Sequence, residues 1–281
     1  MEAQLEQIRD LQKQSWNKIS GGWKKWDSMV MDFLKPMGDE IIRMLNPGGN
    51  DVVLDVGAGT GEPGLTIATR LTGGKVVIND IAEDMLGIAR ENAIRRGIKN
   101  FETDLSDVCE LPFADNTFDV VSCRFGFMFF PDMSLAIKEM VRVLKPGGRI
   151  ATSVWNVPDK NFWVTAIMAS INKHLQPTPS VEGAPGMFRC AKEGLIKDLF
   201  EQAGLKNISE TEIYGKLDCA NAEGYWNFMS EVAGPVAAAL GKVDDNMKAI
   251  IKSEVVKSVE KKYATGKTMV DSNAIVIYGE K

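Results

Sequence analysis

A chain of 281 residues, of which 44% are hydrophobic and 25% charged, holds enough apolar material for one large domain or for one domain with an elaboration. Its formal net charge of −5, with the lysines scattered along the chain, gives no positively charged surface for a phosphate backbone, so nucleic acid is not an expected partner. Residues 1–15 lack a hydrophobic signal region and no stretch approaches the roughly 20 apolar residues of a spanning helix, so we expect a cytoplasmic protein without membrane insertion.

The first 40 residues are expected to form a helical lid. Trp16, Trp23 and Trp26 fall within eleven residues, which is unusual for a solvated tail. They could close over a bound ligand or cover a cation through cation–π contacts, with the pair Gly21 and Gly22 as a hinge. The alternative is that the tryptophans simply dock this segment onto the rest of the fold.

Between residues 41 and 155, short apolar runs alternate with amphipathic stretches. Buried strands are expected over 51–56, 75–80, 118–124 and 148–154. The stretches between them have apolar residues at helical spacing and end in glycine or Pro-Gly, which predicts helices over 62–71, 82–96 and 134–144. This alternation is typical of βαβ units, and therefore predicts a doubly wound, mainly parallel α/β sheet.

From residue 156 to residue 281 the pattern changes to the rest of the sheet with insertions. Prolines and glycines punctuate this part more densely. The expected elements are helices over 162–175, 192–203 and within 221–262, and strands over 208–217 and 273–278. We expect the insertions at about 156–200 and 218–268 to form a helical cap that determines which substrate is bound.

Cysteine and histidine usage excludes several kinds of site. The four cysteines are far apart and form no C-x-x-C pair, so neither a zinc site nor a disulfide framework is expected, and the thiols should be reduced and packed. His174 is the only histidine, which leaves no histidine cluster for a metal and little room for a Ser-His-Asp triad. Because no acidic residues cluster with ligand spacing, we expect no metal site.

The strongest local feature is residues 52–61, a buried apolar run that passes directly into Gly57, Gly59 and Gly61 and then into a helix. Glycines allow positive φ and let the backbone approach a ligand, while the helix directs its first amides at it. The segment from Gly59 to Gly64 also matches G-x-G-x-x-G, so a nicotinamide-dependent dehydrogenase is a competing interpretation.

Two aspartates bear on the choice between these ligands. Asp55 lies two residues before the first glycine, where an acid would repel a pyrophosphate but attract the ammonium and sulfonium groups of S-adenosylmethionine. Asp80, at the end of the next strand, suits the ribose hydroxyls of either nucleoside ligand. The alternative is that both merely cap helices. Together, at this spacing, they favour a binding site.

Four segments resemble a known family: 54–61, 111–113 (Leu-Pro-Phe), 118–121 and 143–149 (Val-Leu-Lys-Pro-Gly-Gly-Arg). They resemble the class I S-adenosylmethionine-dependent methyltransferases, in particular the branch of the ubiquinone and menaquinone C-methyltransferases. The similarity runs in order from residue 40 to residue 155 and resumes at 200–205. It implies a Rossmann-like sheet of seven strands, the last antiparallel, and S-adenosylmethionine as a methyl donor that leaves as S-adenosylhomocysteine.

The resemblance also implies roles by position. Asp107 stands where the family's acid accepts a hydrogen bond from the adenine amine, and Val108 would donate its amide to the ring. Asp104 is a rival at the same strand end, and its distance from the Leu-Pro-Phe motif makes it the weaker candidate. Ile81 and Met85 resemble the apolar residues that sandwich adenine, although aliphatic residues at this spacing are as often core.

The methyl acceptor is expected beyond the strand 118–124, against the aromatic-rich turn that follows it. Relatives often have histidines in this turn, but Met128 and Phe129 stand there instead, so we expect no general base from it. Arg124 could bind the methionine carboxylate or an acceptor carboxylate, or pair with a surface acid. His174 is a second catalytic candidate, although its Asn-Lys-His setting looks exposed. Without a clear base, an acceptor that is already nucleophilic is attractive.

The sequence thus predicts a methyltransferase that acts on an oxygen or carbon nucleophile of a small molecule, a secondary metabolite or a peptide carboxylate. Two alternatives stay open: an NAD(P)-dependent oxidoreductase, which Asp55 disfavours, and a non-catalytic nucleoside-binding protein. The oligomeric state is not fixed by the sequence, and no catalytic residue is assigned beyond the candidates Arg124 and His174. The expected donor-binding residues are Asp55, Gly57, Ala58, Gly59, Gly61, Asp80, Ile81, Met85, Asp107, Val108 and Arg124.

Overall fold

The sheet expected from the alternating pattern is present in the computed structural model, which describes residues 2–175, 183–263 and 267–281. Its strands are β1 (Val52–Val56), β2 (Lys75–Asp80), β3 (Phe101–Leu105), β4 (Phe118–Arg124), β5 (Leu144–Trp155), β6 (Lys206–Asp218) and β7 (Met269–Glu280). They are ordered β3-β2-β1-β4-β5-β7-β6. β1 to β5 pair in parallel, whereas β7 is antiparallel to both β5 and β6. The seven-stranded, mainly parallel α/β fold with an antiparallel last strand is confirmed.

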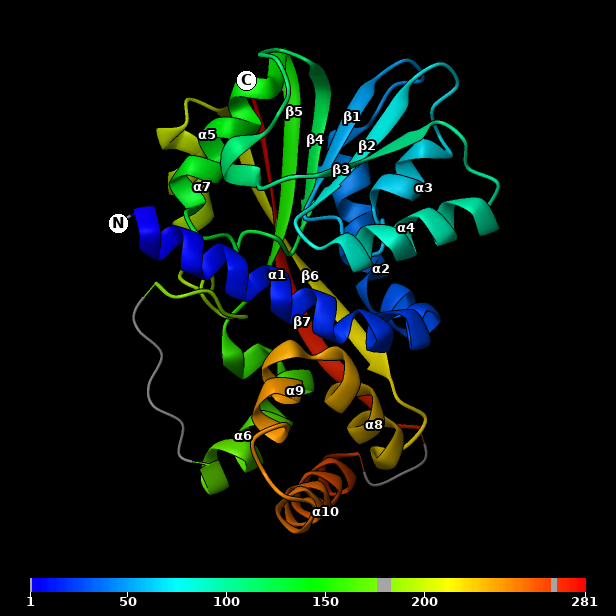
Figure 1. Cartoon of the computed structure of the whole chain (residues 1–281), viewed down its shortest axis with the longest axis vertical. Helices are drawn as coiled ribbons and strands as arrows, with labels where there is room; N and C mark the ends of the chain where they lie inside the picture. The colour runs from blue at the N-terminus through cyan, green and yellow to red at the C-terminus, as the bar shows by residue number, and fades with distance from the viewer. Residues whose placement is uncertain (1, 176–182, 264–266) are drawn as a thin grey trace.

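Helices cover both faces of the sheet (Figure 1). One face carries α2 (Asp27–Leu45), α3 (Gly64–Ala68) and α4 (Glu83–Arg95), and the other carries α5 (Met133–Val143) and α7 (Leu195–Gln202). Successive side chains of a strand point to opposite faces, so Val53 packs with the first group of helices and Leu54 with the second. Burial on both faces explains why these strands have continuous apolar runs.

The strand β3 has no such run, and no apolar pattern predicted its bounds. It lies at the edge of the sheet, and its side chains are partly or fully exposed. Only its two ends, Phe101 and Leu105, are apolar. An edge strand with few buried positions leaves little hydrophobic periodicity for sequence reasoning to use.

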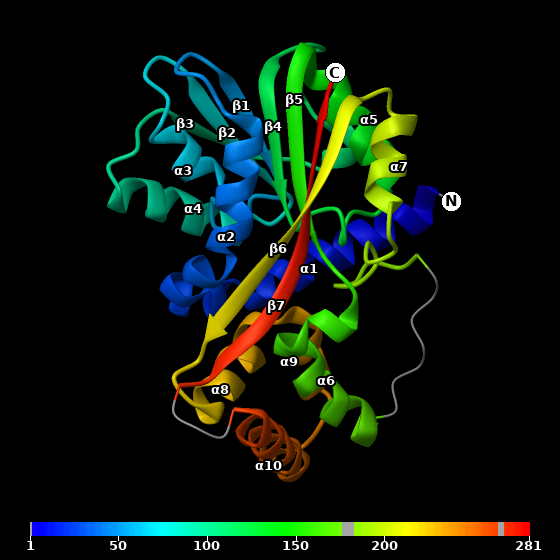
Figure 2. The same cartoon turned by 180° about the vertical axis from the view of Figure 1, so that it is seen from behind.

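Below the sheet lies a helical cap, joined to it by a two-stranded arm. The cap consists of α6 (Phe162–Leu175), α8 (Ala222–Val232), α9 (Gly234–Leu240) and α10 (Asp245–Lys262), with the short helix η2 (Pro158–Lys160) before α6. β7 pairs with β5 only from Ala274 onward, so its first half extends toward the cap with β6 alone (Figure 2). Of the expected insertions, residues 176–182 and 264–266 lie outside the described residues.

The amino-terminal helix α1 (Glu2–Lys25) lies between the sheet and the cap (Figure 1). The expected hinge at Gly21 and Gly22 is not found, because both glycines lie inside this helix. A Cβ on Gly22 would stand 2.1 Å from the carbonyl oxygen of Glu231, so this glycine allows α1 to approach α8 closely. The expected division at residue 40 falls within α2.

Three further observations concern the kinds of site considered above. All four cysteine side chains are buried, as expected of packed thiols. The described residues contain no group of three or more side chains placed to hold a metal ion. None of the described helices is both long enough and apolar enough to cross a membrane.

Candidate active site

A cavity of about 310 Å³ lies at the carboxyl ends of β1, β2 and β4, enclosed by α1 and the cap. This is where ligands bind in open, doubly wound sheets. Most of the expected donor-binding residues line it: Gly57, Ala58, Gly59, Asp80, Ile81, Met85, Asp107, Val108 and Arg124. Asp55 and Gly61 do not, so the structure brings together nine of the eleven.

The turn after β1 is shaped by glycines in the left-handed region. Gly57 has a φ of 59° and Gly59 a φ of 57°, and a Cβ on Gly59 would meet no atom within 4 Å. The open space at Gly59 is therefore a place where a ligand can approach the backbone. Gly61 has a different role, since a Cβ there would stand 2.7 Å from the side chain of Leu65. It allows α3 to pack closely and does not face the cavity.

Asp80 joins two backbone segments beside the cavity, the glycine turn and the start of α4. One carboxylate oxygen accepts from the amide of Gly59 at 2.8 Å, and the other accepts from the amide of Ala82 at 2.9 Å. Burial raises the pKa of this carboxyl group, and the backbone amides oppose that rise. Asp80 thus holds the glycine turn against the start of α4 while it borders the cavity.

Asp55 lies beneath the turn, and this corrects the expectation that its carboxylate faces the ligand's cations. Its side chain has no exposed surface and accepts from the hydroxyl of Ser122 at 2.6 Å and from the amide of Gly64 at 2.8 Å. Burial raises its pKa to about 7. The structure therefore gives Asp55 a supporting role: it fixes the start of α3 relative to β4.

Of the two rival acids at the carboxyl end of β3, the structure places Asp107 in the cavity lining and Asp104, which is still in the strand, outside it. One carboxylate oxygen of Asp107 accepts from the amide of Cys109 at 3.0 Å, which begins the short helix η1 (Val108–Glu110). Asp104 is occupied elsewhere, because it accepts from the side chains of Asn79 and Ser106.

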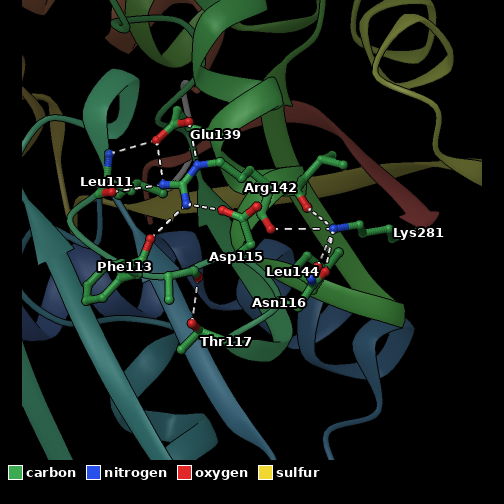
Figure 3. Close-up of polar contacts among 11 residues, drawn as sticks. Leu111, Phe113, Asp115, Asn116, Thr117, Glu139, Arg142, Leu144 and Lys281 are labelled. Carbon is green, nitrogen blue, oxygen red and sulfur yellow. Dashed lines mark hydrogen bonds and ion pairs between the residues drawn. The ribbon is translucent and has the colours of Figure 1, made fainter.

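The segment after η1 is held by an arginine of α5 (Figure 3). The guanidinium of Arg142 donates to the carbonyl oxygens of Leu111 and Phe113 at 2.9 and 2.8 Å, and it pairs with Asp115 and Glu139. Glu139 in turn accepts from the amide of Leu111 at 3.0 Å. Arg142 thereby fixes the loop that carries Asp107 and Val108. The Leu-Pro-Phe segment is the part of this loop whose backbone groups the network binds.

We expect Arg142→Met to lower the free energy of unfolding by about 2 kcal/mol, because two carbonyl oxygens of the loop and two carboxylates lose their donor. Chemical denaturation of the purified variant measures this loss. Arg43→Met is the matched control, since Arg43 is exposed and, within the part of the chain that the structure describes, pairs only with Glu40 one turn away, a contact worth less than about 1 kcal/mol. Equal losses in the two variants would contradict the assigned role of Arg142.

The other end of the cavity is walled by aromatic rings. Trp155 stacks on Phe125 with ring centroids 4.1 Å apart and on Phe33 at 5.8 Å, and Trp163 packs against both Trp155 and Phe33. Phe125 has a φ of 64°, which is unusual for a residue with a side chain. Such backbone conformations tend to occur at functional sites, where the surrounding structure holds them.

Two tryptophans of α1 also line the cavity. Trp16 packs edge-on against Phe129, with centroids 5.2 Å apart, and against Trp23 at 5.9 Å. The indole nitrogen of Trp23 donates to the carbonyl oxygen of Val232 in α8 at 3.0 Å. The lining of this end is therefore mainly aromatic and aliphatic, which disfavours water there.

Arg124 is the polar exception at this end, as expected. It forms no ion pair with a carboxylate of the described residues, and one terminal nitrogen lies 3.9 Å from the sulfur of Met31 in α2. Burial lowers its pKa, while the negative charges of Glu62 and Asp55 oppose that effect. The alternative of a surface salt bridge does not describe this residue. It lies at the cavity, where an anionic group of a ligand can reach it.

The structure does not bring His174 to the cavity. Its Nε2 lies 3.1 Å from the carboxylate of Glu254 in α10, and the residue is absent from the cavity lining. Cys123, next to Arg124, is also unsuited to take part, because burial raises the pKa of its thiol to about 12. Neither side chain can act there as a general base near neutral pH.

Sequence reasoning missed six polar or charged residues of the lining: Arg9, Gln12, Ser15, Glu62, Asn79 and Ser106. Asn79 is buried, and its carbonyl oxygen accepts from the amide of Ala58 while its side chain binds Asp104 and Ser106. A polar residue at the end of an apolar strand was the available indication for it. Nothing local indicates Arg9, because its place depends on how α1 crosses the fold.

Comparisons with known proteins agree with this geometry. The family described as "Methyltransferase domain" matches residues 53–148, from β1 to β5. The ubiquinone/menaquinone biosynthesis C-methyltransferase of Cellvibrio japonicus is 43% identical over 109 residues, which cover 38% of this chain and 43% of the relative. The demethylmenaquinone methyltransferase of Listeria monocytogenes (strain HCC23) is 30% identical over 210 residues, which cover 69% of this chain and 86% of the relative.

Solved structures support the same fold. Phosphoethanolamine N-methyltransferase 2 of Haemonchus contortus, solved in complex with S-adenosyl-L-methionine, matches with a TM-score of 0.61 at 18% identity; the match covers 98% of this chain and 60% of that one. At this identity the likeness concerns the fold alone. The length and identity of the match to the Listeria enzyme carry the conclusion that this chain belongs to the class I S-adenosylmethionine-dependent methyltransferases, in their ubiquinone/menaquinone C-methyltransferase-like branch.

Proposed function

We propose that this chain transfers a methyl group from S-adenosylmethionine to a carbon or oxygen atom of an apolar small molecule. The observation that carries the proposal is the continuity of the cavity, which has the glycine turn, Asp80 and Asp107 at one end and the aromatic wall at the other. A donor and an acceptor bound at the two ends would meet near Arg124 and Gly126, both of which line it.

The donor end fits S-adenosylmethionine. The space at Gly59 admits a ligand against the backbone, and the carboxylate of Asp80 borders the cavity at the place where the fold binds ribose. The buried Oδ2 of Asp107 lies beside Nε of Arg9 without hydrogen-bond geometry, so it can still accept from the adenine amine. When bound, S-adenosylmethionine supplies an electrophilic methyl group on a sulfonium, which leaves as S-adenosylhomocysteine.

The acceptor end favours a planar apolar molecule. Phe33, Phe125, Trp155 and Trp163 offer ring faces and edges, and no general base lies among them. An acceptor that has already lost its proton, as a phenolate or an enolate, needs no base, and the guanidinium of Arg124 would stabilise its negative charge. In this arrangement the residues position the nucleophile and exclude water, which is most of what a methyl transfer requires.

The relatives named above act in quinone biosynthesis by their names, so a hydroxylated ring is the acceptor class we would try first. A peptide carboxylate is the less suitable acceptor, because the aromatic wall offers its backbone few hydrogen-bonding partners.

Two measurements on the purified chain test the proposal. Calorimetric titration with S-adenosylhomocysteine and, in parallel, NADH is expected to show micromolar binding of the first and none of the second. Radiolabelled methyl transfer to 1,4-dihydroxynaphthalene, a hydroxylated benzoquinol and a short peptide is then expected to favour the two ring compounds. Binding of NADH would support the oxidoreductase instead. Donor binding without transfer to any acceptor of the panel would favour the non-catalytic binding protein.

A further inference from the structure

The helix α1 places an arginine at the donor end of the cavity. Nε of Arg9 lies 2.5 Å from Oδ2 of Asp107, and both residues line the cavity. The side chain of Asp107 is 9% exposed and that of Arg9 is 34% exposed. A residue near the start of the chain thus meets the acid that the proposed function assigns to the adenine amine.

This contact is incomplete as a hydrogen bond. Both atoms are buried, and neither has a hydrogen-bonding partner of suitable geometry among the described residues. The other oxygen of Asp107 is already occupied by the amide of Cys109. A buried donor and a buried acceptor that face each other without a proper bond both retain hydrogen-bonding capacity, and a polar ligand at the same place would use it.

The ion pair is also the only polar side-chain contact that joins residues 3–15 to the rest of the described chain. The second half of α1 has several: Asn17 accepts from the amide of Asp84, Trp23 donates to Val232, and Lys25 pairs with Glu231. Among polar side-chain contacts, the ion pair with Asp107 is therefore what holds the first half of α1 in place.

From these contacts we propose that Arg9 is a cofactor-positioning residue, which acts with Asp107 on the adenine end of S-adenosylmethionine; this rests on the donor site of the proposed function. Asp107 accepts from the adenine amine, and Arg9 stays paired with the same carboxylate. This ion pair holds α1 over the adenine base. A planar guanidinium is suited to this place, because it donates within its plane and packs flat on aromatic rings.

The same helix carries the effect to the acceptor end. Trp16 and Trp23, one and two heptads after Arg9, border the aromatic part of the cavity from α1. A donor that engages Arg9 and Asp107 therefore stabilises the helix that closes the acceptor end. Through the ion pair, the position of α1 over the acceptor end would depend on whether the adenine base is bound.

Calorimetry on the full chain tests this with two ligands, S-adenosylhomocysteine and its analogue with unsubstituted purine in place of adenine, which lacks the amine and gains no new acceptor. Arg9→Met is expected to weaken binding of S-adenosylhomocysteine about tenfold and to change binding of the analogue by less than about twofold. Such a difference measures the coupling between the side chain of residue 9 and the adenine amine. Arg9→Lys, which keeps the charge, should restore part of the loss. Lys13→Met, which removes an exposed charge one turn further along α1, is the control and should match the wild type with both ligands.

Each outcome separates the inference from the proposed function. Failure of the wild type to bind S-adenosylhomocysteine would overturn the proposed function itself. Wild-type binding with an equal loss of both ligands in Arg9→Met would show that Arg9 only tethers α1, and unchanged binding of both would show that it plays no part. Either of the last two results overturns the inference and leaves the donor site intact.

Discussion

Asp80→Ala is expected to weaken binding of S-adenosylhomocysteine at least a hundredfold. The carboxylate would lose two hydrogen bonds to the ribose hydroxyls, and hydrogen bonds to a charged group contribute about 1.5 to 3 kcal/mol each. The same substitution removes the acceptor for the amides of Gly59 and Ala82, so the glycine turn also loses its anchor. Calorimetric titration of the purified variant measures the loss directly.

The control for this experiment is Asp84→Ala, because Asp84 lies in the first turn of α4, four residues from Asp80, and its side chain is exposed. It should bind like the wild type. Circular dichroism establishes whether Asp80→Ala is folded at the temperature of the titration. A folded Asp80→Ala that binds within threefold of the wild type would remove Asp80 from the donor site.

The core of this fold was open to prediction because its information is local. Strands buried on both faces have continuous apolar runs, and the bounds of β2 and β4 were predicted to the residue. Gly57 and Gly59 were recognisable because a tight backbone turn after a buried strand requires positive φ. The choice of Asp107 over Asp104 came instead from the resemblance to the methyltransferase family, through its distance from the Leu-Pro-Phe motif.

The limits of prediction lie where a residue's role depends on tertiary packing. The sequence position of Asp55 suits a ligand contact, yet its carboxylate lies beneath the glycine turn and accepts from Ser122 and Gly64. Gly22 looks like part of a hinge, but only the position of α8 explains why it is a glycine. Arg9 carries no local pattern at all, since it reaches Asp107 through the packing of α1.

The aromatic wall is an intermediate case. Its members come from α2, β5, α6 and the turn after β4, and the sequence indicates each as apolar without indicating which would share a cavity. Long-range association of this kind depends on how these elements pack together, which no local pattern specifies. The acceptor end therefore had to be found in the structure, whereas much of the donor end was predicted.

Asp55→Asn is expected to stabilise the protein at neutral and alkaline pH. The folded chain holds the Asp55 proton with a pKa of about 7, against 3.8 for the ordinary group, because burial disfavours the charge. A raised carboxyl pKa stabilises the fold below pH 4, and that stabilisation is lost as the pH rises toward 7. Asparagine has no proton to lose. Its oxygen can accept from the amide of Gly64, and its NH2 group can donate to the hydroxyl oxygen of Ser122, so the variant keeps the stabilisation that the wild type loses.

The quantity to measure is the difference in free energy of unfolding between Asp55→Asn and the wild type, from denaturant titrations at several pH values. It should be small at pH 4, rise through pH 5 and 6, and level off above pH 7 at up to about 4 kcal/mol, since each unit of pKa shift corresponds to about 1.4 kcal/mol. Taking the difference removes the opposite trend of carboxylates such as Glu139 and Glu231, whose pKa values are lowered by their partners.

Asp10→Asn, an isosteric change at an exposed position, is the control. A stable Asp55→Asn that also binds S-adenosylhomocysteine within a few-fold of the wild type would establish that Asp55 supports the glycine turn from below; a hundredfold loss of binding in a folded variant would return Asp55 to the ligand.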